Sequence, residues 1–215
     1  FQSEGYVNMT VKVMKDFGIE LYREENTFFV KGNQKYQAMD YMVEGDYSQA
    51  AYFMAAGAIG GDITVIDLNT ASIQGAMEIV SLLRKMGATI DTVENGYQIK
   101  KSKLKAIDID ISEIPDLTPI LAVLLSLSEG TGRLTNGDRL RYKESDRIKS
   151  TVALINSLGG EALEEKSTII IHGKELLNGG HVFSYNDHRI VMAAAIASLK
   201  TREKVSIEGY EAVNK

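Results

Sequence analysis

Three short, strongly apolar stretches of this sequence are each opened by an aspartate. They begin at Asp46, Asp116 and Asp187, and successive aspartates lie 70 and 71 positions apart. Apolar stretches of this length predict short helices, each opened by its aspartate. A glycine or polar break and a predicted strand follow each helix; the three strands are 62–68, 132–135 and 204–209. The spacing therefore indicates an internal repeat of about 70 residues.

The second half of the repeat combines an amphipathic helix with a hairpin. Apolar residues recur at helical spacing at Met77, Val80, Leu83 and Met86. Gly87 then supplies a C-cap. Predicted strands 89–93 and 97–100 flank Asn95-Gly96, a pair that favours a type I′ turn. The next repeat has the same order, with Gly159-Gly160 before strands 162–165 and 167–172.

The N-terminal residues match this second half. A predicted helix at 7–17 ends at Gly18, and strands 19–22 and 27–31 follow it. The chain therefore holds half a unit, two full units and the start of another. Each unit has the order βαβαββ, which predicts an α/β (α+β) fold made of repeated units.

Composition limits the classes of function. Lys and Arg number 24 against 29 Asp and Glu, giving a formal net charge of −5, so no nucleic-acid partner is expected. No apolar run approaches the ~20 residues of a membrane span, so no membrane partner is expected either. The absence of cysteine excludes disulfides, thiolate metal sites and a cysteine nucleophile within these residues, and it fits a reducing cytoplasm. Because the chain opens with Phe1, we expect it to be a piece of a longer protein.

The densest charged segment is 136–149, which carries five basic and three acidic side chains. A solvated loop would explain this composition. However, the segment follows a predicted strand and opens a helix at about 145–158, where Lys143 and Arg147 can share one face. Helix N-termini attract anions, so this pair is a candidate clamp for a phosphate or carboxylate.

Two further helix starts carry candidate chemistry. His188 and Arg189 lie in the first turn of the helix after Asp187, although a histidine there is often structural. In the segment 114–119, Thr118 and Pro119 are predicted as the N-cap and first residue of a helix. By the repeat, three helix starts point into one region. Asp116 and Glu144 would be available there as acid or base.

Residues 141–148, Arg-Tyr-Lys-Glu-Ser-Asp-Arg-Ile, resemble the strongest signature of the 3-phosphoshikimate 1-carboxyvinyltransferase (EPSP synthase) family. Residues 186–193, Asn-Asp-His-Arg-Ile-Val-Met-Ala, look like its second signature. The segments 43–46 and 114–116 match in order and spacing, as do residues 5–18. The resemblance covers the whole chain, which looks like the C-terminal half of such an enzyme.

This resemblance implies a two-lobed enzyme of six βαβαββ units. Residues 1–45 would belong to the shikimate-phosphate lobe and residues 46–215 to the C-terminal lobe, with a hinge near Glu44–Asp46. The implied reaction transfers the enolpyruvyl group of phosphoenolpyruvate to the 5-hydroxyl of shikimate 3-phosphate and releases phosphate, in the shikimate pathway of aromatic amino acid biosynthesis. It uses no metal and no organic cofactor. The implied partner is the N-terminal half of the same enzyme, and this half alone is expected to be inactive.

The resemblance also implies roles for individual residues. Asp116 would accept the proton of the attacking hydroxyl, and Glu144 would shuttle a proton at the methylene carbon. The implied substrate-binding residues are Ser3, Tyr6, Asp116, Arg139, Lys143, Arg147, His188, Arg189 and Lys215. Among these, Arg147, Arg189 and Lys215 would hold phosphoenolpyruvate.

Two alternatives stay open at this point. One is the related enolpyruvyl transferase that acts on UDP-N-acetylglucosamine, although the segment 143–147 favours the shikimate enzyme. The other is a non-catalytic α/β module that binds anions. Such a module has no use for the carboxylates of Asp116 and Glu144, because they repel anionic ligands.

Overall fold

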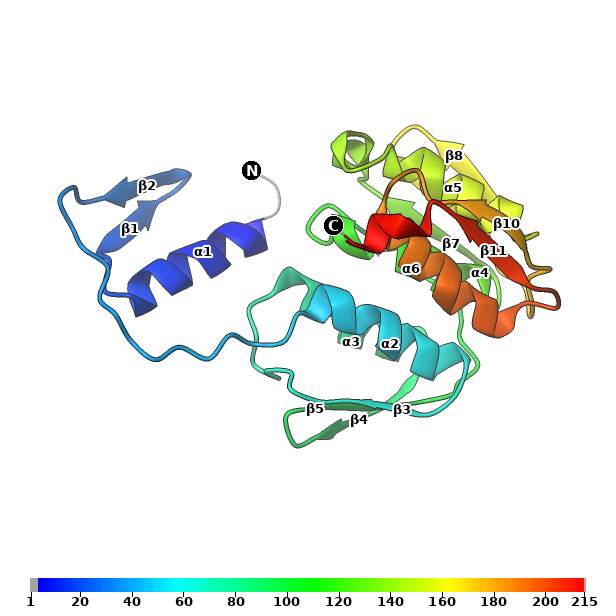
Figure 1. The fold of residues 1–215 in the computed structure, drawn as a ribbon, viewed down its shortest axis with the longest axis horizontal. Coiled ribbons are helices and arrows are strands. Elements are labelled where there is room, and N and C mark those ends of the chain that lie inside the picture. The colour runs from blue at the N-terminus through cyan, green and yellow to red at the C-terminus, as the bar shows by residue number, and fades with distance from the viewer. Residues whose placement is uncertain (1–3, 215) are drawn as a thin grey trace.

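The computed structural model describes residues 4–214, and three helices lie at its centre (Figure 1). These are α2 (Tyr47–Ile59), α4 (Thr118–Ser126) and α6 (His188–Ala197), which contact one another. Every residue of α4 is buried, as the unbroken apolar sequence predicts. The N-terminal ends of these helices supply the candidate site described below.

The first complete unit surrounds α2. Its further elements are β3 (Ile63–Val65), η1 (Gly75–Met77), α3 (Glu78–Lys85), β4 (Thr89–Val93) and β5 (Gly96–Lys100). The strands form an antiparallel sheet in the order β3-β5-β4, with Ile63 opposite Ile99. This sheet packs against α2, and the apolar face of α3 closes the unit.

The second unit repeats this order around α4. Its elements are β6 (Ile109–Asp110), η2 (Pro115–Leu117), β7 (Thr131–Thr135), η3 (Asp138–Tyr142), α5 (Arg147–Ser157), β8 (Glu161–Glu165) and β9 (Thr168–His172). The sheet order is β6-β7-β9-β8, and β6 and β7 run parallel. The repeat predicted from the sequence is therefore confirmed.

The last part of the chain starts a further unit. Strands β10 (Gly180–Phe183) and β11 (Val205–Glu208) pair in parallel and are joined through α6 and η4 (Ser198–Lys200). The short helix η5 (Tyr210–Asn214) follows and packs against α6.

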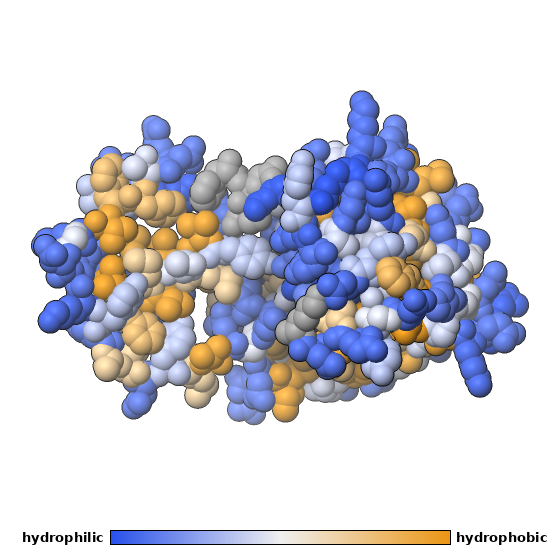
Figure 2. Space-filling model, turned by 45° about the horizontal axis from the view of Figure 1, so that its top comes forward, coloured by the Kyte–Doolittle hydropathy of each residue, from blue (hydrophilic) through white to orange (hydrophobic). Residues whose placement is uncertain are grey.

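The N-terminal elements form a separate body. Helix α1 (Glu4–Asp16) and the hairpin of β1 (Leu21–Glu24) and β2 (Thr27–Val30) lie apart from the helical core (Figure 1). Residues 31–46 join this body to α2 without regular secondary structure. No residue of α1 is buried. Figure 2 shows apolar side chains gathered over this part of the molecule; the exposed ones include Val13, Tyr22, Phe29, Val30 and Met42.

One hairpin prediction is wrong by a residue. The loop between β4 and β5 is Glu94-Asn95, where Asn95 has a φ of 54°, and Gly96 already pairs with Val93. A Cβ atom at Gly96 would lie 2.0 Å from the carbonyl oxygen of Val65. The glycine is therefore required by the close approach of a neighbouring backbone and not by the turn.

Candidate active site

The three aspartates that open the repeated helices do not have the same role. Asp46 caps α2 by accepting from the N–H of Ser48 at 2.7 Å, and Asp187 caps α6 by accepting from the N–H of Arg189 at 3.0 Å. Both helices begin directly after their aspartates, as the sequence predicts.

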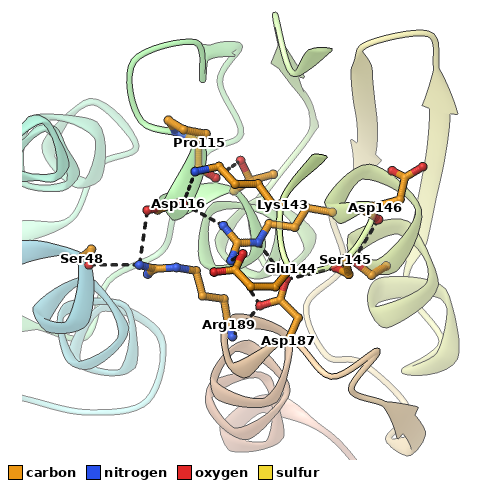
Figure 3. A network of polar contacts seen from close by, with 12 residues as sticks. Ser48, Pro115, Asp116, Lys143, Glu144, Ser145, Asp146, Asp187 and Arg189 are labelled. Carbon is orange, nitrogen blue, oxygen red and sulfur yellow. Dashed lines mark hydrogen bonds and ion pairs between the residues drawn. The ribbon is translucent and has the colours of Figure 1, made fainter. Parts of the chain in front are cut away.

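Asp116 instead lies inside η2, which runs directly into α4. The predicted N-cap at Thr118 is wrong, because its hydroxyl donates backwards to the carbonyl of Pro115 at 2.8 Å. The extra turn moves Asp116 away from the start of α4, and the structure records no capping bond from its side chain. Its carboxylate faces the other two helix starts instead (Figure 3).

Arg147, the first residue of α5, is the centre of the network, and its side chain is completely buried. Its Nε atom donates to Asp187 Oδ2 at 2.8 Å, and its Nη1 atom donates to Asp116 Oδ1 at 2.7 Å. Its Nη2 atom donates to Glu144 Oε2 at 2.5 Å and to Asp187 Oδ1 at 3.3 Å. Each guanidinium nitrogen therefore has a carboxylate partner, which a buried charge requires.

Asp116 receives three further contacts from different parts of the chain. Lys143 Nζ lies 3.2 Å from Oδ1, Arg189 Nη2 lies 3.4 Å from Oδ2, and the Tyr6 hydroxyl donates to Oδ2 at 3.0 Å. Burial alone raises the pKa of this carboxyl, but the charges of Arg189, Lys143 and Arg147 outweigh it and lower the pKa to about 2. Burial and the neighbouring Asp116 carboxylate raise the pKa of Tyr6 to about 12.

Arg189 differs from Arg147 in having unused donors. Its Nη2 atom reaches Ser48 Oγ at 3.3 Å as well as Asp116. Its Nε and Nη1 atoms are buried and have no hydrogen-bond partner among the described residues. Unsatisfied buried charge is costly, so these two N–H groups favour an anionic ligand.

A cleft of about 820 Å³ opens beside this arginine. Asp46, Ser48, Asp116 and Arg189 line one side of it, and Tyr6 and other residues of α1 line the opposite side. Residues 41–44 and the loop around Gln74 complete the lining. The cleft therefore lies between the N-terminal body and the three helix starts.

Most of the predicted site residues come together here. Tyr6, Asp116, Lys143, Glu144, Arg147 and Arg189 all belong to this network. His188 is the half-buried first residue of α6, and its side chain makes no hydrogen bond or ion pair within residues 4–214. Arg139 is exposed in η3. Ser3 and Lys215 lie outside the described residues.

Two members of the network were not predicted as site residues. Asp187 was predicted only as the start of a helix, yet its carboxylate also holds Arg147. Ser48 supplies a hydroxyl to Arg189 from the first turn of α2. In the sequence, both residues stand at or next to the start of a repeated helix. A polar side chain at such a position can face the region that the helix starts surround.

Two kinds of feature are absent from the part of the chain that the structure covers. Within residues 4–214, no group of three or more His, Asp or Glu side chains is arranged to hold a metal ion. No helix in the same range is both long enough and apolar enough to cross a bilayer.

Fold and site together define a repeat-built α/β protein with a cluster of arginine, lysine and carboxylate side chains where helix starts meet. The family model of EPSP synthase (3-phosphoshikimate 1-carboxyvinyltransferase) matches residues 1–215. The chain belongs to the EPSP synthase family, as the resemblance of its motifs indicates.

Individual relatives agree with this assignment. The chain is 49% identical over 215 residues to 3-phosphoshikimate 1-carboxyvinyltransferase of Clostridium acetobutylicum, covering 100% of this chain and 50% of the relative. The enzyme of that name from Brachyspira hyodysenteriae is 45% identical, with 100% of this chain and 52% of the relative covered. A solved structure of EPSP synthase from Acinetobacter baumannii matches with a TM-score of 0.81 at 28% identity, over 95% of this chain and 50% of that one. The chain thus spans about half the length of the curated relatives it matches.

Proposed function

We propose that this chain is the C-terminal half of an enzyme that transfers the enolpyruvyl group of phosphoenolpyruvate to the 5-hydroxyl of shikimate 3-phosphate. The observation that carries the proposal is the pair of unpartnered, buried N–H groups of Arg189 in the cleft beside Asp116. Anionic oxygens of the substrates would satisfy these donors. Family membership supports the shikimate reaction over the UDP-sugar alternative.

In the proposed reaction the 5-hydroxyl oxygen attacks the C2 carbon of phosphoenolpyruvate, while the C3 methylene gains a proton. The hydroxyl proton passes to Asp116, and Glu144 delivers and later removes the proton at C3. Loss of that proton from the tetrahedral intermediate restores the double bond as phosphate leaves. Both carboxylates contact Arg147, which holds them beside one ligand.

The pKa of Asp116, and so its strength as a base, depends on whether the cations around it are bound to a ligand. Without substrate, three cations hold its pKa near 2, where it is a weak base. Anionic groups of the substrates would take up the charge of Arg189 and Lys143. The pKa of Asp116 would then rise, so the base becomes effective only when the cleft is filled.

We assign Arg189, Lys143 and Tyr6 by their place in the network, and His188, Lys215 and Ser3 by the family resemblance alone. Arg189 and Lys215 bind phosphoenolpyruvate, and His188 is next to Arg189 in the sequence. Lys143 contacts shikimate 3-phosphate, and Ser3 and Tyr6 contact its phosphate. Arg147 already satisfies three carboxylates, so its main contribution is to hold them in position.

We also propose that residues 1–45 belong to one lobe and residues 46–215 to the other. The separate hairpin of β1 and β2, the absence of buried residues in α1 and the exposed apolar side chains of this part support the division. We place the reaction in the cytoplasm, in keeping with the absence of cysteine.

The test is turnover by the full-length protein. Purified protein is mixed with phosphoenolpyruvate and shikimate 3-phosphate, and both released phosphate and the enolpyruvyl product are measured. A parallel reaction replaces shikimate 3-phosphate with UDP-N-acetylglucosamine. Product from the sugar nucleotide alone would reject the assignment of the acceptor, and product from neither would reject the proposed reaction.

A further inference from the structure

The segment that joins the N-terminal body to α2 is fastened at both of its ends. On the N-terminal side, Gln34 accepts from the N–H of Glu20 at 2.7 Å and donates to the carbonyls of Glu20 and Lys31. The N–H of Gln37 donates to the carbonyl of Phe17 at 2.9 Å. The rings of Phe17 and Tyr41 lie 5.3 Å apart. The segment therefore belongs to the N-terminal body as far as Tyr41.

On the other side, the loop that precedes η1 holds the segment. Ser72 Oγ donates to Glu44 Oε1 at 3.0 Å. Gln74 makes two bonds to the backbone: its Nε2 atom donates to the carbonyl of Gly45 at 2.9 Å, and its Oε1 atom accepts from the N–H of Tyr47 at 2.9 Å. These contacts attach the segment to the helical core from Glu44 onward.

The two bonds of Gln74 lie on either side of the N-cap residue Asp46. The N–H of Tyr47 is one of the first-turn donors that a helix cannot satisfy internally, and Gln74 satisfies it. The carbonyl of Gly45 fixes the direction in which the chain enters the helix. A Cβ atom at Gly45 would lie 2.4 Å from the carbonyl oxygen of Asp67, so the same loop also presses against this residue.

Only Met42 and Val43 lie between the two fastened stretches, and they are 92% and 82% exposed. Neither residue makes a hydrogen bond within residues 4–214. Two exposed residues without hydrogen bonds can change their φ and ψ at little cost, so the contacts with the loop around Gln74 decide where the start of α2 lies.

We propose that Gln74 is a positioning residue: it clamps the start of α2 and so holds Ser48 and the cleft wall around Asp46 in the binding-competent arrangement. The inference rests on the proposed function in one respect: the arrangement that it maintains is the one that binds phosphoenolpyruvate.

The contacts of Gln74 also affect the ligand site, through Ser48. Ser48 follows the clamped Tyr47 directly, and its hydroxyl accepts from Arg189 Nη2 at 3.3 Å. If the start of α2 is free to move, Ser48 and the cleft wall around Asp46 move with it. Fewer molecules then hold Arg189 in the binding-competent arrangement, and the apparent affinity for the anionic substrate falls in proportion.

The first measurement is amide hydrogen exchange in the full-length protein, compared with the variant Gln74→Met. Methionine keeps the length of the side chain and removes both hydrogen bonds. We expect exchange at Tyr47 to accelerate about tenfold or more, and exchange at Ala50, whose N–H bonds to the carbonyl of Asp46 within α2, to change little. The matched control is Gln49→Met, at an exposed glutamine of the same helix. Unchanged exchange at Tyr47 in Gln74→Met would overturn the clamp.

The second measurement is steady-state kinetics on the same proteins. We expect Gln74→Met to raise the KM for phosphoenolpyruvate about five- to tenfold with a much smaller change in kcat, because saturating substrate restores the competent population. A lower kcat with unchanged KM and a lower melting temperature would indicate a structural role only and would overturn positioning. If the wild-type protein shows no turnover, the proposed function fails, while the exchange experiment still decides the clamp.

Discussion

Asp187 and Arg147 form a completely buried ion pair, with Arg147 Nε 2.8 Å from Asp187 Oδ2. The two residues open different helices, α6 and α5, and lie 40 positions apart in the chain. Asp187 also caps its own helix through the N–H of Arg189. One carboxylate therefore fixes both arginines of the site relative to each other.

Breaking this pair is expected to destabilise the fold strongly. Asp187→Asn leaves the Arg147 guanidinium buried with one carboxylate charge fewer to balance it. Removal of one partner of a buried ion pair costs about 3–5 kcal/mol of stability. Urea unfolding measures the loss. The control is Asp91→Asn, which breaks the exposed pair with Lys100 and should cost less than about 1 kcal/mol. Equal effects of the two substitutions would contradict the structural importance of the buried pair.

Asp116→Asn in the full-length protein is expected to lower kcat by about 10²–10⁴-fold, with a much smaller effect on KM. The amide keeps the shape of the side chain but cannot accept the hydroxyl proton. The exposed Asp108, which pairs with Arg133 at 3.5 Å, supplies the control Asp108→Asn. Near-normal kcat in Asp116→Asn would remove this residue from the role of base.

Arg189→Met is expected to weaken binding of phosphoenolpyruvate about 10- to 100-fold, corresponding to the loss of about 1.5–3 kcal/mol of charge-assisted hydrogen bonding. Arg189→Lys should recover only part of the affinity, because one ammonium group cannot replace the Nε and Nη1 donors, which point in different directions. Titration calorimetry of the full-length protein measures both. Arg202→Met, at an exposed arginine, serves as control. Full affinity in Arg189→Met would place the anion elsewhere.

Acid is expected to destabilise the fold through Asp116 and Asp187. The pKa of Asp116 falls from 3.8 to about 2 on folding, and hydrogen bonds and charge from Arg147 lower the pKa of Asp187 against the opposing effect of burial. As the pH falls, the unfolded chain therefore binds protons before the folded chain does. The stabilisation from these carboxylates is complete above about pH 4 and is lost as the pH falls through about 2. For Asp116 it amounts to about 2 kcal/mol.

Urea unfolding between about pH 6 and pH 3 tests this pH dependence. The stability of Asp116→Asn should decline less steeply toward low pH than that of the wild type. Parallel declines would show that Asp116 keeps an ordinary pKa in the folded protein.

The 215-residue chain alone is expected to fold but not to turn over the substrates. Its three central helices bury their apolar residues within the chain itself. In the proposed enzyme, however, the cleft needs both lobes to orient the substrates and exclude water. Its cations should still bind inorganic phosphate at about millimolar concentration. A phosphate-release assay that found turnover like that of the full-length protein would contradict the shared cleft.

Local chemistry explains what could be predicted from the sequence. The repeat, its apolar helices and their starts after Asp46 and Asp187 depend on residues a few positions apart, so their patterns are visible in the chain. The same is true of the charged segment that carries Lys143, Glu144 and Arg147. The turn prediction failed at Gly96 because this residue lies against the backbone of Val65, a distant segment.

The roles of the two arginines were decided only by tertiary structure. The sequence gives both the same type of position, at the start of a helix. The donors of Arg147 are taken up by carboxylates that include Asp116 and Asp187, 31 and 40 positions away, whereas Arg189 keeps two donors without a partner among residues 4–214. Hydrogen-bond satisfaction depends on distances between segments that only packing brings together. The sequence alone therefore determined which cations stand at the site, and the fold decided which of them remains available to bind a ligand.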